Sequence, residues 1–195
     1  MNFLIQEKIK EAQKLQTVLL QDKELLNKVA QIAELLIEKF QQGNQLLLCG
    51  NGGSASDAMH LAAEFSGRYY LDRKPLRAQA LNVNAAELTA VSNDFGYEAV
   101  FARILESRAQ ANDVLWVFST SGNSSNIVQV LEKAKSLGLK TIAFTGITGG
   151  KIMHLADLVV NVPSTDTPRI QEIHILLGHI ICEIVEKEIF GKVKS

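Results

Sequence analysis

The chain has 195 residues, of which 47% are hydrophobic, and its formal net charge at pH 7 is −1. This length suits one full domain and is short for two, and the near-neutral charge argues against a broad nucleic-acid-binding surface. No apolar run approaches the ~20 residues that a membrane span needs. We therefore expect a single domain over residues 1–195, in the cytoplasm, with no nucleic-acid or membrane partner.

The first forty residues carry the pattern of two amphipathic helices. Apolar residues recur every three or four positions in two stretches, and Asp22 between them is placed to cap the second helix. Gly43 ends that helix. We expect this pair, residues 1–42, to pack outside the main domain and to take part in oligomerisation.

From residue 45 onward, short apolar runs alternate with helical patterns. The runs predict strands at 45–49, 78–81, 114–119, 141–145 and 158–162. Helices are expected up to about residue 66, at 85–91, 98–109, 124–137 and 169–190, with a short helix after Gly150. Nearly continuous apolar strands that alternate with helices are typical of a parallel sheet covered on both faces. The expected fold class is therefore α/β, a three-layer αβα arrangement.

A hydroxyl-rich turn, Ser119-Thr120-Ser121-Gly122-Asn123-Ser124, joins the strand at 114–119 to the next helix. Open α/β sheets bind ligands at the carboxyl ends of their strands, and a helix N-terminus favours an anion. A single hydroxyl would be enough for an ordinary helix cap, whereas this turn has four in six residues. The turn predicts a phosphate site that uses hydroxyl and backbone dipoles in place of a lysine.

A glycine-rich turn, Gly50-Asn51-Gly52-Gly53-Ser54-Ala55, follows the first strand and opens a helix. It satisfies the spacing G-x-G-x-x-A, which raises dinucleotide binding as an alternative. Such a site needs an acid at the end of the second strand to hold the ribose. The chain has Asn82 there, so the pattern gives this alternative little support.

One carboxylate and two histidines are candidates for chemistry. His60 and Glu64 lie four residues apart on one helix face, as an acid/base pair, as two metal ligands or as a solvated pair. His179 interrupts the apolar stripe of the last helix, which fits either a core histidine or a functional one. The spacing of His60 and Glu64 lacks the second histidine of a zincin motif.

Six collinear motifs run through the chain: Cys49-Gly50-Asn51-Gly52-Gly53-Ser54, Asp57-Ala58-Met59-His60 with Glu64, Gly67-Arg68-Tyr69, Asn93-Asp94-Phe95-Gly96, Ser119 to Ser124, and Arg169-Ile170-Gln171-Glu172-Ile173-His174. Together they resemble the sugar isomerase (SIS) family, and within it the sedoheptulose-7-phosphate isomerases. The resemblance covers essentially the whole chain and implies the SIS fold.

This resemblance implies an aldose–ketose isomerase that converts sedoheptulose 7-phosphate to D-glycero-D-manno-heptose 7-phosphate, the first step towards the heptose of bacterial lipopolysaccharide. It implies a homotetramer with active sites between subunits and one zinc ion per subunit, held by His60, Glu64, Gln171 and His179. In an enediol mechanism Glu64 would be the base and His179 the acid. The implied substrate-binding residues are Asn51, Gly52, Gly53, Ser54, Glu64, Asn93, Asp94, Ser119, Thr120, Ser121, Ser124 and Gln171.

Two features of the last helix complicate this assignment. Gln171 and His179 are eight residues apart, which separates them by about 12 Å along a straight helix, so the zinc either lies close against the helix or has ligands from more than one subunit. Thr167-Pro168 stands where some relatives carry an aspartate, and Asp166 is the nearest acid. A non-catalytic SIS adaptor that binds the replication initiator is the alternative function, and the presence of both Glu64 and His179 argues against it.

Overall fold

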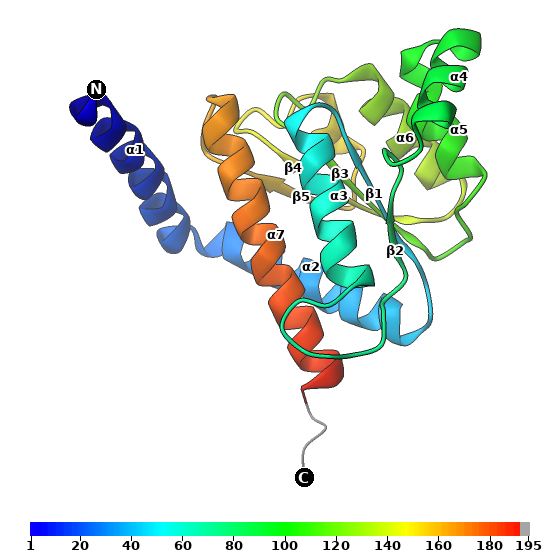
Figure 1. Ribbon diagram of the computed structural model, residues 1–195, viewed down its shortest axis with the longest axis horizontal. Helices are drawn as coiled ribbons and strands as arrows, with labels where there is room; N and C mark the ends of the chain where they lie inside the picture. The colour runs from blue at the N-terminus through cyan, green and yellow to red at the C-terminus, as the bar shows by residue number, and fades with distance from the viewer. Residues whose placement is uncertain (192–195) are drawn as a thin grey trace.

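In the computed structural model, which describes residues 1–191, five parallel strands form one sheet (Figure 1). They are β1 (Leu46–Gly50), β2 (Ala78–Ala80), β3 (Val114–Ser119), β4 (Lys140–Thr145) and β5 (Leu158–Asn161), in the spatial order β2-β1-β3-β4-β5. This order is one of the two common doubly wound arrangements. The predicted parallel α/β sheet is therefore confirmed, with each strand within a few residues of its expected place.

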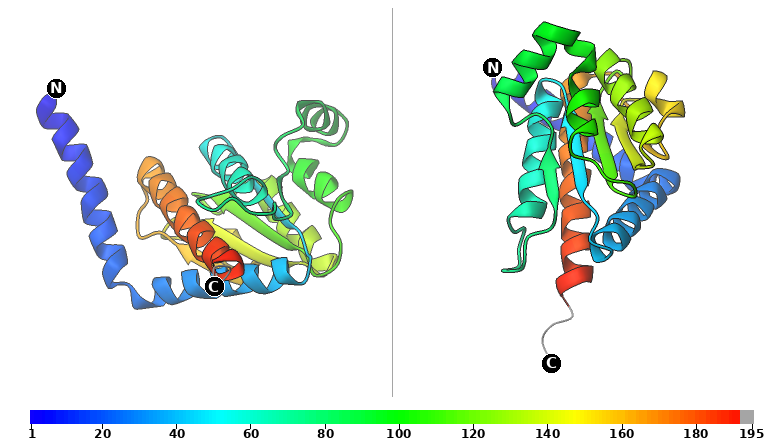
Figure 2. Two further views of the ribbon diagram at one scale, coloured as in Figure 1. Left: turned by 60° about the horizontal axis from the view of Figure 1, so that its bottom comes forward. Right: turned by 90° about the vertical axis from the view of Figure 1, so that its right-hand side faces the viewer.

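Helices cover both faces of the sheet (Figure 2). The helical elements are α1 (Asn2–Gln21), α2 (Lys23–Gln41), α3 (Gly53–Ser66), α4 (Ala85–Phe95), α5 (Val100–Glu106), α6 (Ser125–Ser136) and α7 (Thr167–Phe190), with short 3-10 turns at Tyr97–Ala99 and Lys151–His154. Trp116 and Phe118 of β3 pack towards α2, α3 and α7, whereas Leu115 and Val117 face α5 and α6. This alternation along one strand produces the three layers.

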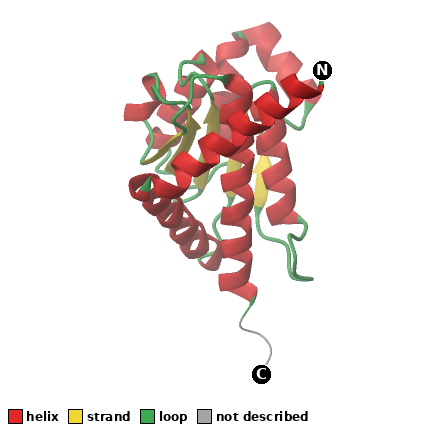
Figure 3. Ribbon diagram, turned by 90° about the vertical axis from the view of Figure 1, so that its left-hand side faces the viewer, coloured by secondary structure: helices red, strands yellow, loops and turns green. Residues whose placement is uncertain are grey.

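The two N-terminal helices have different positions. α1 lies outside the layers, as expected, and Leu19 is its only buried residue. The expectation that α2 also lies outside is wrong. This helix joins the helical layer beside α7 and β5, because its apolar stripe is buried there, with Leu25, Val29, Ile32, Ala33 and Leu36. In Figure 3, where helices are red and strands yellow, α1 begins at the N label and crosses in front of the rest of the molecule. Asp22 caps α2 as predicted, since its Oδ1 accepts a hydrogen bond of 2.9 Å from the Leu25 N–H.

Two other helices differ from their sequence patterns. α4 continues to Phe95, so Asn93 and Asp94 lie on its last turn, and the helix expected at 98–109 consists of a 3-10 turn followed by α5, which ends at Glu106. Among residues 1–191, no helix combines the length and the apolar character that crossing a bilayer requires.

His174 is a buried core histidine on α7. Its ring lies 5.5 Å from that of Phe144 and 5.9 Å from that of Phe118, and its Nε2 faces the Thr145 carbonyl oxygen at 3.4 Å. Burial lowers the pKa of His174 to about 4. The unfolded chain takes up this proton near pH 6.5, so stability is greatest above that pH and falls as the pH drops towards 4.

We expect this histidine to make unfolding pH-dependent. Between pH 7 and pH 5 the free energy of unfolding should fall by about 2 kcal/mol through His174 alone. His174→Leu should remove this part of the pH dependence while the other titrating groups keep theirs. Urea unfolding of both proteins at pH 7 and pH 5 measures how much the free energy of unfolding changes with pH. An equal change in the wild type and in His174→Leu would contradict this role of His174.

Candidate active site

The two turns that the sequence predicts to bind a ligand lie where the strand order reverses. β1 and β3 are neighbours, with Gly50 paired in register with Phe118, while α3 follows β1 on one face and α6 follows β3 on the other. The turns at 50–53 and 119–124 therefore leave the sheet side by side at its carboxyl edge. In doubly wound sheets this crevice is where ligands bind.

The side chain of Asn51 connects the first turn to α6, the helix that follows the second turn. Asn51 and Asn126 exchange two amide hydrogen bonds of 2.9 Å each, and the Tyr97 hydroxyl donates a third of 2.9 Å to Asn51 Oδ1. Asn126 is 2% exposed. The side chain of Asn51, a predicted substrate contact, thus has a structural role, and these three bonds leave one N–H of its Nδ2 unused.

The hydroxyl-rich turn has more hydroxyl groups than its helix needs. Ser124 occupies the N-cap position of α6, yet its side chain makes no capping hydrogen bond, and its Oγ lies 3.4 Å from Ser119 Oγ. Gly122 has a φ of +66°, and a Cβ there would lie 2.1 Å from the Gly149 carbonyl oxygen, so only glycine fits. Helix capping therefore does not account for these hydroxyls, which favours the phosphate interpretation.

A cavity of about 230 Å³ opens beside this turn. Its wall includes hydroxyl side chains from three segments, Thr120 and Ser121, Thr148, and Ser164, Thr165 and Thr167. No residue lining this cavity in the described chain carries a charge. An anion here would be held by dipoles, as the sequence predicted, together with the N-terminus of α6.

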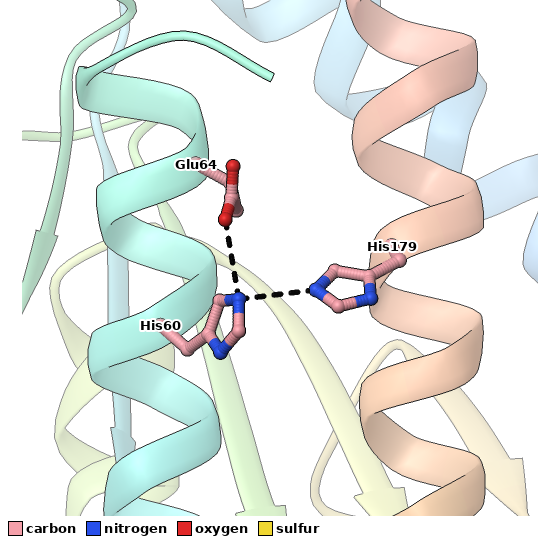
Figure 4. Close-up of side chains that lie close together, drawn as sticks. All are labelled: His60, Glu64 and His179. Atoms are coloured by element: carbon pink, nitrogen blue, oxygen red, sulfur yellow. Dashed lines mark hydrogen bonds and ion pairs between the residues drawn. The ribbon is translucent and has the colours of Figure 1, made fainter. Parts of the chain in front are cut away.

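Glu64, His60 and His179 converge between α3 and α7 (Figure 4). His60 Nε2 lies 3.1 Å from Glu64 Oε1 and 3.1 Å from His179 Nε2. One ligand atom from each of the three residues lies within 4.8 Å of the other two. His60 is exposed and the other two are half-buried. We call these residues the α3–α7 trio.

The surroundings of the trio bias its protonation. Burial lowers the pKa of His179, His60 lowers it further, and the Glu64 carboxylate opposes both. Three residues before His60, burial raises the pKa of Asp57 to about 6, and its Oδ2 has no partner. Asp57 is not among the predicted site residues, although its spacing of three residues from His60 places both on one face of α3.

The trio fits a zinc ion. Two imidazole nitrogens and one carboxylate oxygen form the donor set of many catalytic zinc sites, which leave a fourth position open. The atoms already point at one another, and His60 Nε2 faces both other donors.

Gln171 does not join the trio within the chain. A Cβ added to Gly53 would lie 2.6 Å from Gln171 Nε2, so this amide lies against the first residue of α3. His60 follows Gly53 by seven residues, about 10 Å along the helix. Of the four predicted metal ligands, the fold thus brings together three.

Comparisons with known proteins show which family this chain resembles. The SIS domain family matches residues 9–146. A phosphoheptose isomerase from Aneurinibacillus thermoaerophilus is 47% identical over 190 residues, which cover 97% of this chain and 96% of that protein. The structure of a phosphoheptose isomerase from Neisseria gonorrhoeae superposes with a TM-score of 0.90 at 36% identity, over 95% of this chain and 98% of the other. This chain belongs to the phosphoheptose isomerase family of SIS proteins.

Family membership leaves the dinucleotide alternative without support. At the end of β2, Asn82 donates a hydrogen bond of 2.8 Å to the Gly50 carbonyl oxygen, where a ribose-binding site would place an acid. The position that a ribose-binding acid would occupy therefore holds an amide that is already bonded to the first glycine turn.

The remaining predicted site residues lie apart from the trio. Asn93 and Asp94 are exposed at the end of α4, where the Asn93 amide donates to Asp94 Oδ1 at 2.9 Å, and Ser54 is buried in the first turn of α3. Asp166 precedes α7 and is exposed, and it does not line the hydroxyl-walled cavity.

Gly178 allows the close approach of α3 and α7 that forms the trio. A Cβ on this residue would lie 2.6 Å from Leu61 Cδ1. We expect Gly178→Val to force the two helices apart and to lower the free energy of unfolding by about 1–3 kcal/mol. Urea unfolding measures this loss, and unchanged stability would show that the helix contact is looser than the structure indicates.

Proposed function

We propose that this protein is a phosphoheptose isomerase, which interconverts D-sedoheptulose 7-phosphate and D-glycero-D-manno-heptose 7-phosphate. The observation that carries the proposal is the convergence of Glu64, His60 and His179 in a chain 47% identical, over nearly its full length, to a phosphoheptose isomerase. The hydroxyl-walled cavity and its turn offer a site for the phosphate.

The proposed chemistry moves one proton between neighbouring carbons through an enediol. Glu64 removes the proton from carbon, and His179 donates a hydrogen bond or proton to the carbonyl oxygen. A lowered pKa keeps His179 neutral near pH 7, and a neutral imidazole N–H can polarise a carbonyl in enediol chemistry. The phosphate turn fixes the far end of the substrate, so that its binding energy orients the reacting carbons.

We also propose one zinc ion per subunit. His60, Glu64 and His179 would hold it, and the partner subunit's Gln171 is the candidate fourth ligand, because Gln171 of the same chain lies against Gly53. When bound, zinc would supply a Lewis acid at the substrate carbonyl. Glu64 and His179 would transfer protons only when released from the ion, because a carboxylate bound to zinc is a poorer base and an imidazole nitrogen bound to zinc has no proton to donate.

The proposed assembly is a homotetramer with active sites between subunits. α1 supports it, because this helix lies outside the layers and exposes six large apolar side chains, Phe3, Leu4, Ile5, Ile9, Val18 and Leu20. The trio also lies at the outer side of α3 and α7 with His60 exposed, where a second subunit can reach it. A cytoplasmic location and a place at the start of heptose synthesis for lipopolysaccharide complete the proposal.

Incubation of the purified protein with sedoheptulose 7-phosphate tests this function. Formation of the aldose, followed by NMR, is the expected result. The absence of product both with and without added zinc would overturn it and would favour the adaptor alternative, to which the relatives named above give no support.

A further inference from the structure

Glu64 stands in the last turn of α3, which ends at Ser66. The last four carbonyl groups of a helix have no partner within it, and helix ends fray for that reason. The position of a proton-transferring carboxylate has to be fixed to within a fraction of an ångström. The last turn of a helix is therefore a poor place for one unless other contacts stabilise that turn.

Arg73 stabilises this turn by hydrogen bonds to its free carbonyl groups. Its Nη2 donates to the Glu64 carbonyl oxygen at 2.9 Å, and its Nη1 donates to the carbonyl oxygens of Phe65 at 2.8 Å and Gly67 at 3.1 Å. A guanidinium at a helix C-terminus also interacts favourably with the helix dipole. The aromatic ring of Phe190 lies 5.4 Å from Arg73 Cζ and covers the cation. The backbone of Glu64 is therefore bonded directly to a buried arginine.

Glu186 on α7 holds Arg73 in turn. Its Oε1 accepts from Arg73 Nε at 2.8 Å and from the Tyr69 N–H at 2.9 Å, and its Oε2 accepts from the N–H groups of Tyr70 and Leu71 at 2.6 and 2.9 Å. The side chains of Arg73 and Glu186 are only 2% and 3% exposed. This buried pair has its hydrogen bonds satisfied, in contrast to an exposed ion pair.

The pair also connects the two helices of the trio. Glu186 follows His179 by seven residues, two turns along the same face of α7. The ring of Tyr69, whose N–H bonds to Glu186, lies 5.8 Å from the ring of His179. One set of hydrogen bonds thus runs from α7 through Arg73 to the turn that carries Glu64.

We propose that Arg73 and Glu186 are positioning residues for the isomerase reaction, which fix the Glu64 turn of α3 relative to His179 on α7. This inference rests on the proposed function. Neither residue belongs to the substrate-binding turns, so their loss should act on the chemical step and leave phosphate binding intact.

Two variants weaken the connection in different places. Arg73→Lys keeps the positive charge but loses the planar fork that bridges several carbonyl groups, and Glu186→Gln keeps the shape but loses the charge. We expect each to lower kcat at least about tenfold, because small misplacements of a reacting group cost up to ~10²-fold, while KM stays within about twofold. Ile104→Ala is the control for a loss of stability alone, because it removes a buried side chain of α5 on the opposite face of the sheet.

Hydrogen exchange gives a second readout that needs no activity. Peptides covering residues 64–71 should exchange faster in both variants, while α6 stays as protected as in the wild type. Unchanged exchange in these peptides, an unchanged kcat, or an equal loss of kcat in Ile104→Ala at similar thermal stability would each overturn the inference. A wild-type protein without isomerase activity would refute the proposed function instead, and the exchange data would then decide whether the connection holds the turn.

Discussion

Glu64→Gln is expected to lower kcat by about 10²–10⁴-fold, the usual contribution of a general base. Glutamine has nearly the same shape but cannot accept the proton from carbon. The fold should persist, because the Glu64 side chain is half-buried at the surface between two helices and its backbone keeps the hydrogen bond to Arg73. Initial rates with sedoheptulose 7-phosphate measure the effect, and circular dichroism checks the fold.

Glu132→Gln is the matched control for this experiment. Glu132 is an exposed acid on α6, away from the trio, and the same change there should leave kcat within about twofold. A Glu64→Gln enzyme that keeps more than roughly a tenth of the wild-type kcat would exclude Glu64 as the base.

His179→Gln should produce a loss of similar size, about 10²–10⁴-fold in kcat. Glutamine keeps an N–H donor, but unlike an imidazole ring it cannot accept a proton and return it. The same change should weaken zinc binding, because His179 Nε2 is one of the three converging donor atoms. Steady-state kinetics measure the first effect, and competition with a chromophoric chelator measures the second.

The double variant Glu64→Gln/His179→Gln distinguishes a joint role from two separate ones. Groups that act as a unit are strongly non-additive, so the double variant should be little slower than either single one. Multiplied losses would indicate that the two residues act in different steps. His154→Gln, at an exposed histidine in the 3-10 turn before β5, is the control and should leave both kcat and zinc affinity unchanged.

The apolar periodicity of the chain predicted most of the fold. Strands such as β3 are buried over their whole length, and that burial produces the continuous apolar runs that predict a parallel sheet. The same reasoning did not separate α1 from α2, because both carry an apolar stripe. The apolar stripe of α2 is buried in the core beside the sheet, whereas in α1 Leu19 alone is buried.

The candidate site was only partly predictable. The spacing of His60 and Glu64 placed them on one face, but no local pattern says that His179 lies 3.1 Å from His60, since 119 residues separate them. The roles of Arg73 and Glu186 also depend on a contact across 113 residues. Helix geometry did anticipate the separation of Gln171 from His179, and the structure adds the contact of Gln171 with Gly53.

The paired amides of Asn51 and Asn126 couple the first glycine turn to α6 and, through the start of that helix, to the hydroxyl-rich turn before it. Each amide completes the other, so Asn126→Ala would leave a polar group of Asn51 unpaired, and the first glycine turn would loosen although it was not itself altered. Substitutions in one turn should therefore change the effect of substitutions in the other. We therefore expect a change of ligand specificity to need substitutions in both turns at once.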